Sequence, residues 1–124
     1  MIVDDDYYIR ELYEYVFTDL GYQVETAENG KDGLEKAVIF RPDCMLIDIN
    51  MPEMTGAEFA EKLRGSPDPG RKNIPFVAMT GENCLETSIH HALRDNPSCK
   101  ALLPKMTSPN SVAQMVQAIL KPGK

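Results

Sequence analysis

Short apolar runs alternate with segments of helical periodicity along the whole chain. The runs predicted as strands cover residues 2–3, 22–27, 44–47, 74–79 and 101–103. The segments 9–20, 34–38, 59–63, 85–93 and 112–119 carry apolar residues three and four positions apart, which predicts helices. Strands that alternate with helices favour an α/β fold: a doubly wound, five-stranded parallel sheet in the flavodoxin-like order 2-1-3-4-5, with five helices covering both faces.

Local sequence features mark where these elements begin and end. Asp6 is predicted to cap the first helix, and Gly21 to follow its last turn. Asn29-Gly30 interrupts the pattern before the second helix. Ser108-Pro109 is a favourable start for the last helix, because proline lacks an N–H that the first turn would leave unbonded. Since no repeat or second domain is visible, residues 1–124 are expected to form one domain.

Composition narrows the class of protein. The chain of 124 residues is 43% hydrophobic and 26% charged, which is typical of a soluble globular domain. No apolar run approaches the roughly 18 residues that span a bilayer, and no signal peptide is apparent. The net charge of −6 argues against direct nucleic-acid binding. Three cysteines without CxxC spacing favour reduced thiols. We therefore expect a cytoplasmic protein without membrane contact.

Polar residues whose side chains could bind a ligand or take part in catalysis fall at the ends of the predicted strands. Asp4 and Asp5 follow the first strand, Asp48 ends the third, Thr80 ends the fourth and Lys105 follows the fifth. In an open doubly wound sheet, ligands bind outside the carboxyl ends of the strands. The predicted strand order makes the first and third strands neighbours, so we expect Asp5 and Asp48 to meet in one shallow acidic pocket.

The residue types in this pocket suit phosphoryl transfer. Clustered carboxylates raise one another's pKa, and a hard divalent cation such as Mg²⁺ relieves that repulsion. Lys105 adds a positive charge and Thr80 adds a hydroxyl donor, while an aspartate can itself be the nucleophile. Each residue taken alone has an ordinary explanation as a turn, a helix cap or a surface lysine. Their conjunction at successive strand ends favours the functional interpretation.

Several stretches resemble the signature of bacterial response-regulator receiver domains. They are Val3-Asp4-Asp5-Asp6, the segment from Pro42-Asp43 through Asp48-Ile49-Asn50-Met51-Pro52 to Thr55-Gly56, Ala78-Met79-Thr80-Gly81, and Lys105. The resemblance covers essentially the whole chain in order and spacing. It implies that Asp48 is phosphorylated by a histidine kinase or phosphotransfer protein. It also implies a protein that catalyses its own phosphorylation and dephosphorylation rather than a conventional enzyme.

The same resemblance assigns roles around the acceptor. Mg²⁺ or Mn²⁺ would be held by Asp5, by Asp48, by Asp4 partly through water, and by the backbone carbonyl of Asn50. Thr80 and Lys105 would bind phosphoryl oxygens. The output surface would be the face formed by the fourth helix, the fifth strand and the fifth helix, and the family allows a homodimer on phosphorylation.

The sequence departs from the family pattern at two positions. Met106 follows Lys105 where receivers usually have a proline joined by a cis bond, and Leu102 replaces the usual switch aromatic. The usual coupling between Thr80 and an aromatic is therefore not expected in its standard form. The first strand is also short, so a native chain that starts earlier, or a receiver cut from a longer regulator or hybrid kinase, is one expectation.

Two other functions compete with a phospho-accepting switch. The departures at Leu102 and Met106 favour a degenerate receiver that acts as a constitutive interaction domain. A metal-dependent phosphatase with an aspartyl nucleophile typically carries a second aspartate two residues after the nucleophile, where this chain has Asn50. The resemblance to receivers further implies that the side chains of Asn50 and Glu82 flank the path of the hydrolytic water. His90 and His91 are predicted to lie on the surface.

Overall fold

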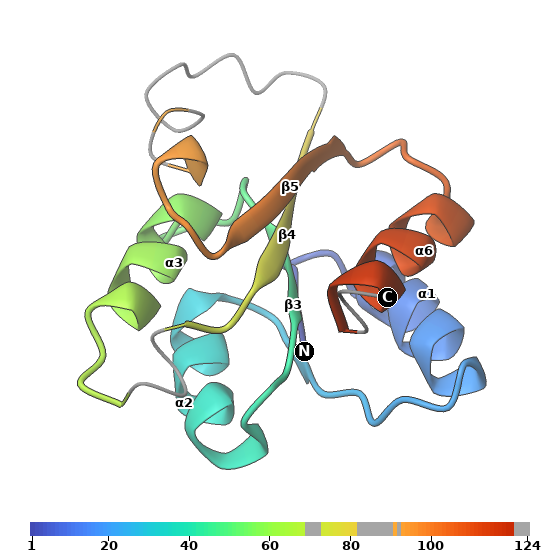
Figure 1. The fold of residues 1–124 in the computed structure, drawn as a ribbon, viewed down its shortest axis with the longest axis horizontal. Helices are drawn as coiled ribbons and strands as arrows, with labels where there is room; N and C mark the ends of the chain where they lie inside the picture. The colour runs from blue at the N-terminus through green and yellow to red at the C-terminus, as the bar shows by residue number, and fades with distance from the viewer. Residues whose placement is uncertain (69–72, 82–90, 92, 121–124) are drawn as a thin grey trace.

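A parallel sheet of five strands in the order β2-β1-β3-β4-β5 forms the centre of the molecule, as predicted. The structure is a computed structural model that describes residues 1–68, 73–81, 91 and 93–120 (Figure 1). The strands are β1 (Ile2–Val3), β2 (Thr26–Ala27), β3 (Met45–Asp48), β4 (Phe76–Thr80) and β5 (Cys99–Pro104). The helices are α1 (Tyr7–Asp19), α2 (Gly30–Phe40), α3 (Gly56–Arg64) and α6 (Pro109–Leu120).

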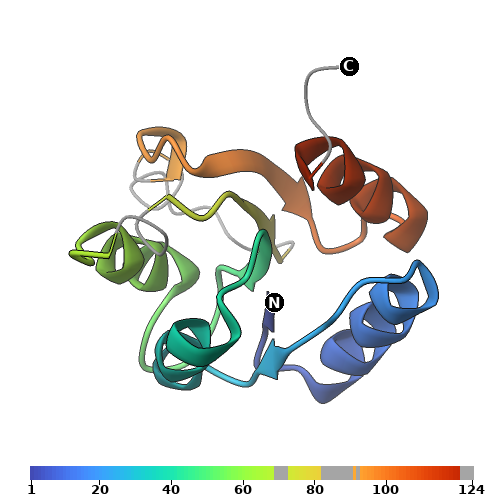
Figure 2. The ribbon, with the colours of Figure 1, turned by 60° about the horizontal axis from the view of Figure 1, so that its bottom comes forward.

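Helices cover both faces of the sheet, and each face has its own apolar core. Figure 2 shows α1 and α6 on one side of the sheet and α2 and α3 on the other. Phe59 and Phe76 are buried in the core under α2 and α3, whereas Tyr13 and Val112 are buried in the core under α1 and α6. Because successive side chains of a strand point to opposite faces, β3 contributes Met45 and Ile47 to the first core and Leu46 to the second. This two-sided burial explains the continuous apolar run in that strand.

The predicted helix starts are present. The Asp6 carboxylate accepts a hydrogen bond from Tyr8 N and caps α1, and the Asn29 carboxamide accepts one from Asp32 N and caps α2. Ser108 accepts a hydrogen bond from Ser111 N at the start of α6. Gly21 follows α1 with a φ of +94°, a conformation that glycine adopts without strain. The predicted fourth helix over 85–93 lies mostly outside the described residues. In this part of the chain the described residues His91, Leu93 and Arg94 are helical.

The second and fifth strands differ most in length from the prediction. The second strand was predicted over 22–27 but contains only Thr26–Ala27. Tyr22 instead continues the turn that ends α1: its N–H donates to the Phe17 carbonyl at 3.0 Å, and its ring packs edge-on against the Phe17 ring. The fifth strand begins earlier than predicted, because Cys99 pairs with Phe76 across a register irregularity that lengthens the β4–β5 ladder.

Candidate functional site at the carboxyl edge of the sheet

Asp4 leaves the end of β1 and is held from several directions. Its N–H donates to the Ala27 carbonyl at 3.0 Å, which extends the pairing of β1 with β2 by one residue. Its side chain is buried, and Oδ1 accepts a hydrogen bond from Asp6 N at 2.9 Å. Its own carbonyl accepts a hydrogen bond from the Arg10 guanidinium at 2.8 Å. These contacts place a buried carboxylate beside the end of β3.

Asp48, the last residue of β3, has a side chain with no exposed surface. Its Oδ1 accepts a hydrogen bond from Asn50 N at 3.1 Å, which closes a turn after the strand. The start of α3 packs directly beneath this turn: a Cβ placed on Gly56 would lie 2.5 Å from the Asp48 carbonyl oxygen and 2.9 Å from Ile49 Cα. Only a residue without a side chain allows α3 to approach the Asp48 backbone so closely.

Lys105 connects the two buried carboxylates. Its Nζ lies 3.3 Å from Asp4 Oδ2 and 3.2 Å from Asp48 Oδ2, and its side chain is only 25% exposed. A backbone hydrogen bond fixes the position from which this side chain extends, because Lys105 N donates to the Thr80 carbonyl at 2.8 Å. A turn closed by Thr107 N and the Pro104 carbonyl follows, and no peptide bond among the described residues is cis. The residues predicted at the ends of β1, β3 and β5 therefore lie together.

The acidic residues have the arrangement of a cation site. One carboxylate oxygen each of Asp4, Asp5 and Asp48 lie within 4.8 Å of one another, with Asp5 exposed to solvent. Asp48 Oδ2 is buried and, although it is paired with Lys105, receives no hydrogen bond from the described residues. Carboxylate oxygens with an open solvent side are the ligands that Mg²⁺ and Mn²⁺ prefer. The donor set thus fits a hard divalent cation.

Burial and mutual repulsion perturb the ionisation of the cluster. Burial, followed by the neighbouring Asp4 carboxylate, raises the pKa of Asp48 to about 7, although Lys105 opposes the change. The pKa of Asp4 is also raised, chiefly by burial. Burial acts to lower the pKa of Lys105, but the Asp4 and Asp48 carboxylates together outweigh it and hold that pKa above its ordinary value. The site therefore concentrates negative charge that a single lysine compensates incompletely.

The remaining predicted residues border the cluster. Thr80 ends β4, half-buried, and its hydroxyl donates to the neighbouring Gly81 carbonyl at 3.1 Å. The Asn50 side chain is exposed, and its Nδ2 would lie 3.2 Å from a Cβ placed on Gly81, so Asn50 and Gly81 are neighbours across the rim. The predicted positions Glu82 and His90 lie outside the described residues. Leu102 is half-buried against the core under α2 and α3.

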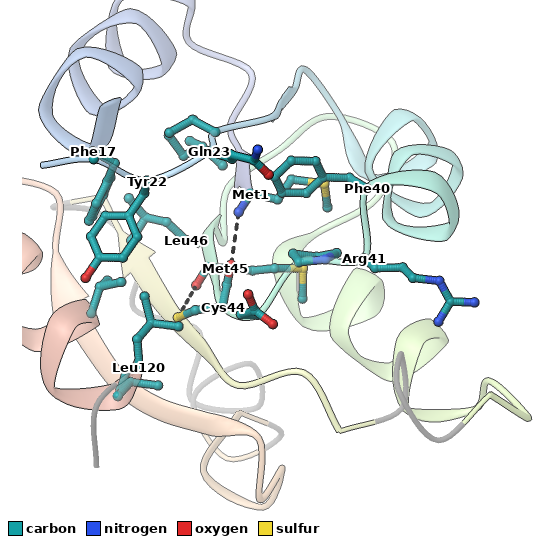
Figure 3. Close-up of a pocket in the computed structure, with 17 residues that line it drawn as sticks. Met1, Phe17, Tyr22, Gln23, Phe40, Arg41, Cys44, Met45, Leu46 and Leu120 are labelled. Carbon is teal, nitrogen blue, oxygen red and sulfur yellow. Dashed lines mark hydrogen bonds between the residues drawn. The ribbon is translucent and has the colours of Figure 1, made fainter. Parts of the chain in front are cut away.

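Sequence reasoning did not identify Arg10 or the role of Gly56 as parts of this site. It also gave no indication of a pocket of about 690 Å³ at the amino edge of the sheet, lined by Phe17, Tyr22 and Phe40 (Figure 3). In that pocket the Met1 amino group donates to the Cys44 carbonyl at 2.9 Å. None of the predicted site residues lines it, because it lies at the opposite ends of β1 and β3.

Comparison with known proteins gives a consistent family. A family model described as the response regulator receiver domain matches residues 1–119. The response regulator MprA of Mycobacterium tuberculosis is 30% identical over 89 residues, which are 72% of this chain and 37% of that protein. The chain thus spans a little over a third of the length of this relative. Among the described residues, none of the helices has the length and apolar character that crossing a membrane requires.

Solved structures show the same fold. The chemotaxis protein CheY4 of Vibrio cholerae superposes with a TM-score of 0.82 at 30% identity, covering 95% of this chain and 94% of that one. The signal receiver domain of a signal transduction histidine kinase from Syntrophus aciditrophicus has a TM-score of 0.82 at 25% identity, covering 97% of this chain and 87% of that one. The five-stranded order and helical layers of this chain are therefore those of such domains.

Proposed function

This chain belongs to the response regulator receiver domain family, and from that premise we propose that Asp48 accepts a phosphoryl group in a transfer assisted by Mg²⁺ or Mn²⁺. The observation that carries the proposal is the buried Asp48 carboxylate, with two further aspartates and the Lys105 ammonium gathered around it at the carboxyl edge of the sheet. Phosphoryl transfer depends on positioning and on the neutralisation of charge, and this cluster provides residues for both.

Asp5, Asp48 and the Asn50 carbonyl would bind the metal directly, and Asp4 partly through water. When bound, the cation would neutralise the carboxylates and the oxygens of the transferring group. In the transfer, a carboxylate oxygen of Asp48 forms a bond to phosphorus while the P–N bond of a phosphohistidine donor breaks. The electron pair of that bond remains on the imidazole nitrogen. Lys105 and Thr80 then pair with the phosphoryl oxygens, so the Thr80 hydroxyl leaves the Gly81 carbonyl.

The proposed donor is a histidine kinase or a phosphotransfer protein, as the family implies, in the cytoplasm. Leu102 occupies the position of the usual switch aromatic, and its side chain already packs against the core. An aliphatic side chain at this position has no hydroxyl group or aromatic ring that could move together with Thr80. We therefore propose that Thr80 acts on its own loop and on Lys105 rather than through residue 102.

The test is chemical phosphorylation followed by mapping. Incubation with acetyl phosphate and Mg²⁺, trapping with borohydride and mass spectrometry should place one adduct on Asp48. Asp48→Asn should lose it, while Asp43→Asn, which changes an exposed aspartate just before the start of the same strand, should keep it. An adduct that persists at the wild-type level in Asp48→Asn would refute the assignment.

A negative result in a folded protein that still binds Mg²⁺ would favour the second candidate, a degenerate receiver that acts only as an interaction domain. The observation behind this candidate is the unusual loop after β5, in which Met106 follows Lys105 and is 78% exposed. An exposed methionine beside the site is suited to contact with a partner protein.

A further inference from the structure

The guanidinium of Arg10 donates a hydrogen bond to a backbone carbonyl although several carboxylates line the same hollow. Its side chain is half-buried in a hollow of about 230 Å³ between α1 and α2, which is also lined by Glu14, Glu28 and Asp32. Among the described residues, no carboxylate lies within ion-pair distance of its guanidinium. The guanidinium instead donates to the neutral carbonyl of Asp4 at 2.8 Å.

One further contact of the guanidinium and one backbone hydrogen bond of Arg10 support this arrangement. It lies over the ring of Tyr7 at 5.8 Å from the ring centre, within the range of a cation–π contact. The backbone N–H of Arg10 donates to the carbonyl of the capping residue Asp6 at 3.1 Å, so the first turn of α1 is bonded to the loop that precedes it. The guanidinium that donates to the Asp4 carbonyl is thus carried by the bonded first turn of α1 and contacts the Tyr7 ring.

Asp5 lies between two residues that are fixed in this way. On one side, Asp4 is bonded through its N–H to Ala27 and through its carbonyl to Arg10. On the other side, Asp6 donates its N–H to Asp4 Oδ1 and accepts a hydrogen bond from Tyr8 N at its carboxylate. The exposed Asp5 carboxylate therefore reaches Asp48 from a loop whose path is set by its neighbours.

We propose that Arg10 is a positioning residue for the cation site: by holding the Asp4 carbonyl, it fixes the peptide between Asp4 and Asp5 and keeps the Asp5 carboxylate facing Asp48. This inference rests on the proposed function, in which the three aspartates hold a divalent cation. Groups that orient metal ligands without touching the metal commonly change affinity by roughly 10–100-fold when they are removed.

The sign of the effect separates positioning from simple electrostatics. Arg10 is a positive charge close to a cation site, so if it acted only through its charge, its removal would strengthen Mg²⁺ binding. If it positions Asp5, its removal weakens binding although a repulsive charge has been lost. Replacement by lysine keeps the charge and one donor, and a lysine can make this kind of bond, since Lys36 Nζ donates to the Thr26 carbonyl at 2.7 Å.

The experiment measures Mg²⁺ binding to the unphosphorylated protein by calorimetry, alongside its thermal unfolding in EDTA. Arg10→Met, which keeps length but removes charge and donor, should weaken Mg²⁺ roughly tenfold. Arg10→Lys should recover affinity to within about threefold of wild type. Tyr7→Leu should weaken binding in the same direction and to a smaller extent, and it stands in for Arg10→Met if that variant unfolds.

Arg64→Met is the matched control, because Arg64 pairs with Glu61 at the end of α3, away from the cluster. It should bind Mg²⁺ like wild type. Equal or tighter binding by folded Arg10→Met, or by Tyr7→Leu if the former is unfolded, would overturn the positioning role while leaving the proposed function intact. Absence of Mg²⁺ binding by wild type would overturn the proposed function and this inference with it.

Discussion

Replacing Asp48 with asparagine should stabilise the metal-free protein. Burial and the Asp4 carboxylate raise the pKa of Asp48 from 3.8 to about 7, so the ionised form is disfavoured in the folded state. At about 1.4 kcal/mol for each pKa unit, this interval corresponds to roughly 4 kcal/mol. Asparagine has the shape of the neutral acid without its charge. Asp48→Asn should therefore raise the free energy of unfolding at pH 8 by about 2–4 kcal/mol.

The effect should depend on pH with a defined sign. An acid whose pKa is higher in the folded protein than in the unfolded chain stabilises the fold when protonated. This contribution is complete below pH 3.8 and is lost as pH rises through 7. The advantage of Asp48→Asn should consequently shrink to about half at pH 5.5. Burial lowers the pKa of the Met1 amino group to about 6, so this group makes the stability of the fold rise with pH, opposite to Asp48. For this reason only the difference in stability between variant and wild type isolates the contribution of Asp48.

Urea unfolding in EDTA at pH 5.5 and pH 8 measures both quantities. Glu35→Gln is the control, because it removes an exposed carboxylate from the middle of α2, and it should change stability by less than about 0.5 kcal/mol at either pH. If Asp48→Asn were no more stable than wild type at pH 8, or if its advantage grew as pH fell, the carboxylate would not be an unfavourable buried charge.

Three further changes test other parts of the site. Lys105→Ala removes the cation between Asp4 and Asp48 and should cost about 1–3 kcal/mol of stability at pH 8 in urea unfolding, but much less at pH 5; an equal loss at both pH values would contradict an electrostatic role. Gly56→Ala should cost about 2–4 kcal/mol because of the clash with the Asp48 backbone, whereas Gly65→Ala, whose nearest contact would be 3.6 Å, should be nearly neutral by the same assay. Asn50→Arg should lengthen the lifetime of the phosphorylated form, because the exposed carboxamide borders the site and an arginine there would pair with phosphoryl oxygens. The measurement is the decay of the phosphorylated form with Mg²⁺ after the donor is removed. An unchanged decay would exclude control of water access at this position.

The placement of the main residues was predictable because it depends on the backbone alone. Strand order and strand direction decide which residues meet at a sheet edge, so Asp5, Asp48 and Lys105 could be brought together from the apolar pattern and the ends of its runs. The helix cap at Asp6 was predictable for a similar reason, since a capping side chain bonds a backbone group two or three residues away.

Features that depend on contacts between side chains and distant backbone were not predictable. The bond from Arg10 to the Asp4 carbonyl requires the angle at which α1 leaves the sheet, which apolar periodicity does not encode. The clash that a side chain at residue 56 would make depends on how closely α3 approaches β3. The late start of the predicted second strand goes with the position of Tyr22, whose ring packs on Phe17 and whose N–H bonds the end of α1.

The cluster combines an unfavourable buried charge with a rigid frame, and under the proposed function this combination would allow the site to respond to a ligand. Asp48 ends a strand that is buried on both faces, so its carboxylate cannot lower the free-energy cost of ionisation by moving into solvent. Relief must come from Lys105, from a proton or from a bound cation, and all of these would act at the carboxyl ends of the strands, outside the two cores. A ligand shifts a conformational equilibrium only by its difference in affinity for the two states. Under the proposed function, transfer of a phosphoryl group to Asp48 would exchange the Lys105–Asp48 pair for a pair with phosphoryl oxygens, and the loop after β5 would change because Lys105 is fixed to Thr80 through its backbone.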